Sequence, residues 1–108
     1  MFVGLPVSDY ATAYDWYERL LGRPADMFPH DREAVWRLTP AGSIYVVEDG
    51  ERAGCGLVTV ALDDLDALER RLAADGLPFT VEAEGDSPRR LAIEDDDGNK
   101  LTFFRDPS

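Results

Sequence analysis

The chain has 108 residues, a length that supports a single domain because two independent hydrophobic cores are hard to stabilise at this size. Acidic residues outnumber basic residues by 22 to 11, which gives a formal net charge of −11. Such a charge repels phosphate backbones and anionic headgroups, so we expect neither nucleic-acid binding nor membrane association. Neutral and cationic small molecules are compatible with it.

Cysteine content and hydropathy predict the cellular compartment in which the protein is located. The single cysteine, Cys55, excludes a disulfide within the chain, as is typical of a reducing environment. No apolar run approaches the length of a membrane span, and the first residues lack the basic segment of a signal peptide. We therefore expect a cytoplasmic protein.

The first half of the chain predicts a strand, a helix and three further strands. Apolar residues alternate over residues 3–7, and a wide apolar face at helical spacing covers residues 10–21. Ser8 or Asp9 is placed to cap this helix, and Gly22 is placed to end it. The three strands are expected at about residues 25–28, 34–38 and 43–48.

The same pattern returns after a polar, glycine-containing segment, residues 51–56, which is typical of a linker. A strand at residues 57–62 precedes a second helix, with Asp63 or Asp64 placed to cap it and Gly76 placed to end it. The remaining strands are expected at about residues 79–82, 89–94 and 100–104. The acidic run at 95–97 and the glycine after it predict a solvated tight turn between the last two strands.

These two halves form an internal repeat. Val3, Leu5, Val7 and Asp9 match Val58, Val60, Leu62 and Asp64 at an offset of 55 residues. The repeat predicts an α+β fold of one domain with two βαβββ modules, residues 1–50 and 57–108. Neither half is large enough to form a good core alone, so the modules must pack together or exchange with a second chain.

The chain resembles the vicinal oxygen chelate superfamily, which includes glyoxalases, bleomycin-resistance proteins and extradiol dioxygenases. The motifs that carry the resemblance are Leu5-Pro6-Val7-Ser8-Asp9, Trp16-Tyr17, Leu21-Gly22, Leu62-Asp63-Asp64-Leu65, Gly76 and Asp95-Asp96-Asp97-Gly98-Asn99-Lys100-Leu101. Their order and spacing cover nearly the whole chain. The resemblance implies a curved mixed sheet with a central cup, helices on the outside, and a homodimer. Whether the modules pair within one chain or exchange between chains stays open.

Enzymes of this superfamily hold a divalent metal with His or Glu at four positions of the two modules. The corresponding residues here are Phe2, Tyr45, Leu57 and Thr102. None of these side chains is a good ligand for a divalent transition metal. The only histidine, His30, and the only thiol lie in polar segments away from those strands. The sequence therefore predicts no metal, no cofactor and no catalytic residue.

Strand alternation predicts the side chains that line the cup, because successive side chains point to opposite faces of a sheet. The face opposite the helices carries aromatic and small residues and almost none of the negative charge. Trp36 or its neighbour Val35 adds to it, and Arg89 or Arg90 is placed to pair with a ligand carboxylate or in a surface ion pair. The candidate ligand-binding residues are Phe2, Gly4, Trp36, Tyr45, Val47, Leu57, Thr59, Ala61, Arg89, Thr102 and Phe104.

The first functional hypothesis is a metal-free protein that sequesters a flat aromatic or cationic small molecule, such as an antibiotic. An alternative is an enzyme of the same superfamily, a lyase, isomerase or dioxygenase with a non-standard site. Against it, only Tyr45, Thr59 and Thr102 offer hydroxyl groups in the cup. A third hypothesis is a degenerate module that serves as a partner-binding or sensor surface.

Overall fold

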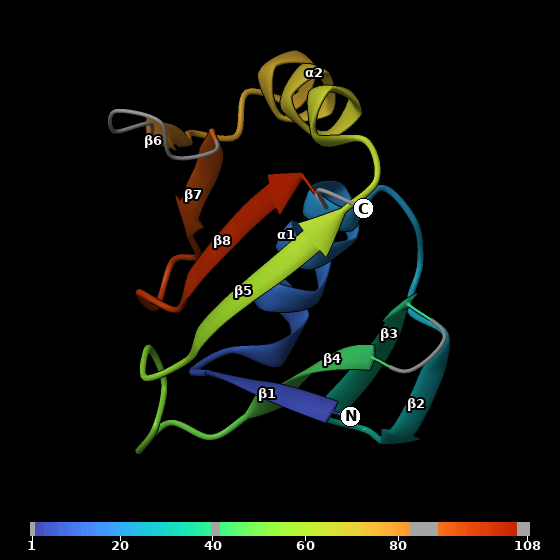
Figure 1. The fold of residues 1–108 in the computed structure, drawn as a ribbon. Helices are drawn as coiled ribbons and strands as arrows, with labels where there is room; N and C mark the ends of the chain where they lie inside the picture. The colour runs from blue at the N-terminus through green and yellow to red at the C-terminus, as the bar shows by residue number, and fades with distance from the viewer. Residues whose placement is uncertain (1, 40–41, 83–88, 106–108) are drawn as a thin grey trace.

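The computed structural model describes residues 2–39, 42–82 and 89–105. Its elements are β1 (Phe2–Val7), α1 (Tyr10–Leu21), β2 (Met27–His30), β3 (Glu33–Thr39), β4 (Gly42–Glu48), β5 (Leu57–Leu62), α2 (Leu65–Asp75), β6 (Thr80–Glu82), β7 (Arg90–Glu94) and β8 (Lys100–Arg105). They form two four-stranded sheets, ordered β1-β4-β3-β2 and β5-β8-β7-β6 (Figure 1). The predicted α+β fold of two βαβββ modules is confirmed.

Both sheets have the same mixed topology. β1 runs parallel to β4, and β5 runs parallel to β8, whereas the other neighbouring strands are antiparallel. Each parallel pair needs a crossover connection, which begins with the helix of its own module. β1 and β5 therefore lie at sheet edges. In the described part of the chain, no helix is long and apolar enough to cross a membrane.

Both helices end where the sequence predicts. Gly22 and Gly76 adopt left-handed conformations, with φ of 76° and 70°, that close the C-termini of α1 and α2. The Asp64 carboxylate caps α2 by accepting the backbone N–H of Ala67 at 2.9 Å. The second helix is one residue shorter than the first, 11 residues against 12, as the spacing of the two glycines predicts.

The N-terminus of α1 is capped differently from the sequence-based expectation. Asp9 occupies the N-cap position, but its side chain accepts no backbone N–H. Instead, the Glu48 carboxylate at the end of β4 accepts the backbone N–H of Tyr10 at 3.1 Å. The parallel pairing of β1 with β4 places Glu48 beside the start of the helix, and a carboxylate there also favours the helix dipole.

The hydrophobic core lies between each sheet and the helices. The strand residues expected to face the helices are buried or pack against the core: Val3, Leu5, Val7, Ile44, Val46, Val58, Val60, Leu62, Leu101 and Phe103. Each sheet thus has one face covered by helices, as strand alternation predicts.

One strand starts later than expected. β2 begins at Met27, two residues after the predicted start. The reason is Asp26, whose carboxylate pairs with Arg23 at 2.8 Å and accepts the backbone N–H of Arg37 at 2.6 Å. These bonds from the Arg23 guanidinium and the Arg37 backbone lower the pKa of the Asp26 carboxyl. The chain entering β2 is therefore held to β3 by the Asp26 side chain as well as by the backbone bond from Asp26 N–H to the Val35 carbonyl at 2.7 Å.

Candidate functional site

The face of the first sheet that turns away from the helices, here called the first open face, is apolar along β1 and the middle of β4 but carries the ion-paired His30 and Glu33 and also Arg37 on β2 and β3. Strand pairing places Gly4 beside Tyr45, and Tyr45 beside Val35 on its other side. Phe2 and Val47 share this face, and Phe2 is 62% exposed. Four of these five residues are aromatic or branched aliphatic, so the face offers a flat apolar surface for stacking.

Gly4 is required by the position of the Tyr45 ring. A Cβ atom built on Gly4 would lie 2.6 Å from both the Cζ and Oη atoms of Tyr45. The aromatic ring therefore lies flat across the backbone of β1, where only glycine leaves room for it. This close approach sets the orientation of the largest side chain on the first open face.

The corresponding face of the second sheet, here called the second open face, carries the other predicted residues. Thr59 pairs with Thr102, and Ala61 pairs with Phe104. Leu57, at the start of the edge strand β5, is 74% exposed, whereas Thr102 is only 8% exposed. Strand alternation therefore placed these five residues on one face correctly.

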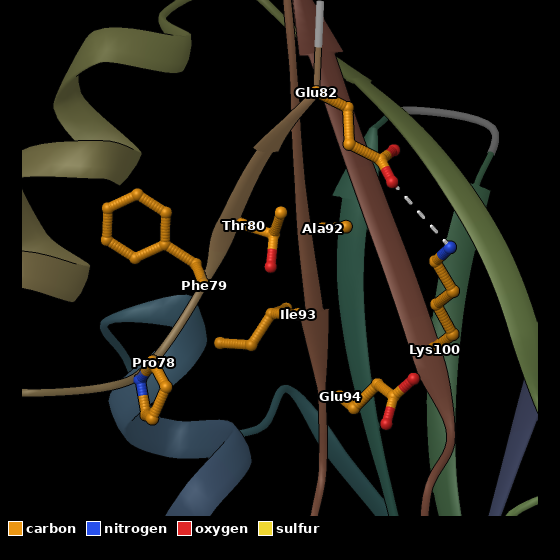
Figure 2. A pocket seen from close by; sticks show the side chains of 8 residues that line it. All are labelled: Pro78, Phe79, Thr80, Glu82, Ala92, Ile93, Glu94 and Lys100. Atoms are coloured by element: carbon orange, nitrogen blue, oxygen red, sulfur yellow. Dashed lines mark ion pairs between the residues drawn. The ribbon is translucent and has the colours of Figure 1, made fainter.

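The second open face also carries charged residues that the sequence analysis missed. Figure 2 shows Glu82, Glu94 and Lys100 around a cavity of about 340 Å³, with Ala92 between them. The Lys100 ammonium lies 4.0 Å from the Glu82 carboxylate, and Glu94 is paired with Lys100 in the strand register. The expectation that this face carries almost no acidic group is therefore wrong. The alternation of side chains between the two faces of a strand, applied to the predicted strands at residues 79–82, 89–94 and 100–104, could have placed these charged residues on the same face as Thr102.

Trp36 does not line an open face. Its side chain is fully buried on the helix side of β3, with its ring centroid 5.4 Å from that of Tyr14 and 6.3 Å from that of Tyr17. The indole N–H donates to the Arg23 carbonyl at 2.9 Å. The neighbouring Val35, offered as the alternative, faces the open side instead. The placement of Trp36 in the ligand site is therefore wrong.

Arg89 also lies outside the open faces. Its guanidinium pairs with Asp66, at 3.1 Å, and with Glu69, both on α2. Arg90, one residue later, pairs with Phe104 in the strand register and so belongs to the second open face. Of the two roles considered for Arg89, the surface ion pair is the one that the structure shows.

The two sheets are not joined to each other by strand pairing in the described part of the chain. There, each sheet hydrogen-bonds only its own four strands, and β1 and β5 are each one of the two outer strands of their sheet. A mostly apolar groove of about 190 Å³ runs beside β5, lined by Val3, Leu38, Thr39, Gly42, Ser43, Ile44, Val58, Thr59, Val60 and Ala61. The outer edges of β1 and β5, each starting with a highly exposed apolar residue, are thus not paired with another strand among the described residues.

The donor set does not fit a divalent metal. The four positions that the resemblance assigns to metal ligands hold a phenylalanine, a tyrosine, a leucine and a threonine, all on the open faces. Within the part of the chain that the structure describes, no group of three or more His, Cys, Asp or Glu side chains is arranged to hold a metal ion. Ordinary His and carboxylate coordination is therefore not available at these positions.

Comparison with known proteins agrees with this architecture. The family model of the Glyoxalase/Bleomycin resistance protein/Dioxygenase superfamily matches residues 2–103. A solved glyoxalase/bleomycin resistance protein from Catenulispora acidiphila DSM 44928 is 33% identical, with a TM-score of 0.93 over 99% of this chain and 97% of that chain. No curated protein matches the sequence.

Two more distant structures share the fold. The bleomycin resistance determinant encoded on transposon Tn5 is 19% identical, with a TM-score of 0.80 over 100% of this chain and 98% of that chain. A bleomycin-binding protein complexed with bleomycin is also 19% identical, with a TM-score of 0.74 over 95% of this chain and 94% of that chain. The family-model match and the 33% identity over nearly the whole chain, together with the shared topology, show that the chain belongs to the glyoxalase/bleomycin resistance protein/dioxygenase superfamily.

Proposed function

We propose that this protein binds a flat aromatic or cationic small molecule without a metal, in a cup built from open faces of two chains. The observation that carries the proposal is the composition of the first open face, where Tyr45 lies across Gly4 beside Phe2. Such a surface binds planar ligands by stacking. Its residues at the superfamily's metal positions, Phe2 and Tyr45, supply no imidazole, thiolate or carboxylate, and the ion-paired His30 and Glu33 lie elsewhere on the same face.

A homodimer would complete the cup. The first open face of one chain and the second open face of a second copy would form its two walls, with β1 and β5 meeting at their free edges. Two features support this arrangement: exposed edge strands favour pairing with another chain, and the side chains of Phe2 and Leu57 are 62% and 74% exposed. Burying apolar surface stabilises such a contact by about 25 cal/mol per Å².

The excess of acidic residues in the chain favours a ligand with a cationic group. On the second open face, the carboxylates of Glu82 and Glu94 could pair with such a group, although Lys100 and Arg90 on the same face balance their charge. The net charge of −11 would also speed the approach of a cation. Two structural relatives are by name a bleomycin resistance determinant and a bleomycin-binding protein, which supports an antibiotic-like ligand.

Calorimetric titration and thermal denaturation with metal-free bleomycin test the proposal. We expect saturable binding, and a rise in Tm that grows with ligand concentration, in buffer that contains EDTA. A panel of divalent metals without bleomycin is the parallel experiment. A rise in Tm with stoichiometric metal, together with binding that requires this metal, would contradict the proposal and favour the enzyme hypothesis.

Replacing Tyr45 with alanine is expected to weaken binding of bleomycin about tenfold, because a stacked ring contributes roughly 1 kcal/mol beyond its buried area. The dissociation constant from calorimetric titration checks this result. Val81→Ala is the matched control, since Val81 is an exposed apolar residue that lies outside both open faces. Equal affinities of the Tyr45→Ala variant and the unmodified protein would remove Tyr45 from the site.

Gly4→Ala is expected to weaken binding while every group that contacts the ligand is retained. The added methyl group forces the Tyr45 ring to move, because it would lie 2.6 Å from ring atoms. The same titration measures the effect, and Gly50→Ala is the control, because a Cβ atom at Gly50 meets nothing within 4 Å. If Gly4→Ala and Gly50→Ala bind equally well, the ring orientation is unimportant for binding.

A further inference from the structure

A buried polar cluster joins the two modules at the turn between β7 and β8. Asp95 is only 8% exposed, although it belongs to a turn expected to be solvated. One carboxylate oxygen accepts the Tyr17 hydroxyl and the Asn99 side-chain amide, each at 2.7 Å. The other accepts the backbone N–H groups of Asp97 and Asn99, at 3.0 and 2.9 Å. Burial, and next the Asp95 carboxylate, raise the pKa of Tyr17, so its hydroxyl remains a donor.

Asn99 extends this cluster to β1 and to the linker. Its side-chain N–H donates to the carbonyl of Pro6 at 2.7 Å, across 93 residues of sequence. Its side-chain oxygen accepts the backbone N–H of Gly56 at 2.6 Å, across 43 residues. A Cβ atom at Gly56 would lie 2.7 Å from that oxygen, so glycine permits the close approach. A single buried side chain thus binds the last turn, the first strand and the linker together.

Other polar contacts between the modules are the exposed bond from the Ser8 backbone N–H to the Asp97 carboxylate, at 3.1 Å, and contacts at the ends of the helices. Arg71 of α2 donates to the carbonyl of Leu20 in α1 at 2.9 Å, and Arg19 of α1 donates to the carbonyl of Asp75 in α2 at 2.8 Å. The Arg19 and Asp75 side chains are 50% and 44% exposed, and exposed pairs contribute little to stability. The Arg71 bonds are partly buried, whereas several bonds of the cluster around Asp95 are fully buried, so among these polar contacts the cluster is the stronger restraint on how the modules are oriented.

We infer that Tyr17, Asp95 and Asn99 act as a clamp that sets the angle between the modules. This inference rests on the proposed function: in a two-fold dimer each chain supplies one wall to each of the two cups, so the angle between its modules affects the spacing of the walls in both. The side chains of Tyr17 and Asn99 are fully buried and lie on neither open face. Binding sites need their walls placed to within about 0.5 Å. The clamp residues are therefore positioning residues for a ligand that they do not touch.

Tyr17→Phe tests the clamp, because it removes one hydroxyl and keeps the ring. Spin labels on cysteines introduced at the exposed residues Ala11 and Ala74, in a Cys55→Ser background, report the distance between α1 and α2. Labelled chains are diluted with unlabelled chains, so that double electron–electron resonance measures distances within one chain. We expect a broader distance distribution and an affinity for bleomycin at least tenfold weaker, with an unchanged far-UV circular dichroism spectrum.

Two further variants complete the test. Asp95→Asn keeps the shape of the side chain and is expected to act in the same direction as Tyr17→Phe. Arg19→Ala removes an exposed contact between the modules and is expected to leave distances and affinity unchanged. A lower Tm with an unchanged distance distribution and unchanged affinity would overturn the clamp, because the cluster would then only stabilise the fold. If the unmodified protein does not bind bleomycin, the proposed ligand is wrong, and the distance distribution alone decides the clamp.

Discussion

Trp36→Ala is expected to lower the free energy of unfolding by about 4 kcal/mol, within the range for deleting a large buried aromatic side chain. Trp36 is fully buried and packs against Tyr14 and Tyr17, so its removal leaves a cavity between β3 and α1. Urea denaturation followed by circular dichroism measures the loss. Folded Trp36→Ala protein should bind bleomycin as tightly as the unmodified protein, because Trp36 lies on neither open face.

Trp36→Phe separates packing from hydrogen bonding at this position. Phenylalanine keeps much of the ring but loses the indole N–H that donates to the Arg23 carbonyl at 2.9 Å. We expect a smaller loss of about 1–2 kcal/mol, the cost of one unsatisfied partly buried acceptor and some lost volume. Weaker binding by either variant without a loss of stability would return Trp36 to the ligand site and contradict its burial.

Asn99→Ala is expected to destabilise the protein by about 4 kcal/mol, since it removes three hydrogen bonds of a fully buried side chain at once, one buried and two partly buried. The Gly56 N–H, the Asp95 carboxylate and the Pro6 carbonyl each lose a partner, and the Pro6 carbonyl keeps a 3.3 Å bond from Gly54. Each buried polar group left without a partner costs about 1–3 kcal/mol. Urea denaturation again measures the change.

Asp96→Ala is the matched control for this turn. Asp96 is exposed, so its substitution should change stability by no more than about 0.5 kcal/mol. A loss below about 1 kcal/mol for Asn99→Ala would mean that water replaces the missing amide. In that case Asn99 would not be a significant structural link between the modules.

The sequence is sufficient for the order of elements and for the repeat. Helix ends at Gly22 and Gly76 follow from local chemistry, because glycine adopts the left-handed conformation that closes a helix without steric cost. The faces of β1, β4, β5 and β8 that meet the core also follow from the sequence, because successive side chains of a strand point to opposite faces of the sheet. The sequence also shows directly that the residues at the superfamily's metal positions are poor ligands, because the ability to bind a metal depends first on the type of side chain.

The face of β3 could not be read in the same way. Ala34, Val35 and Trp36 are all buried, although their side chains alternate between two sides of the sheet. A strand that is apolar on both faces has no alternation in hydropathy, so the sequence does not say which side meets the helix. Packing of α1 decided that Trp36 joins the core, while Val35 lies on the first open face.

The acidic residues show most clearly what sequence determines and what tertiary structure decides. Composition alone establishes a strongly negative chain, and turn chemistry alone places a tight turn before the last strand. Only the fold separates Asp95, buried beneath Tyr17 and Asn99, from its exposed neighbour Asp96. The same holds for Glu82 and Glu94, which strand register brings to one open face. The physical reason is that burial and partners depend on segments far apart in the chain, whereas charge and turn propensity are local.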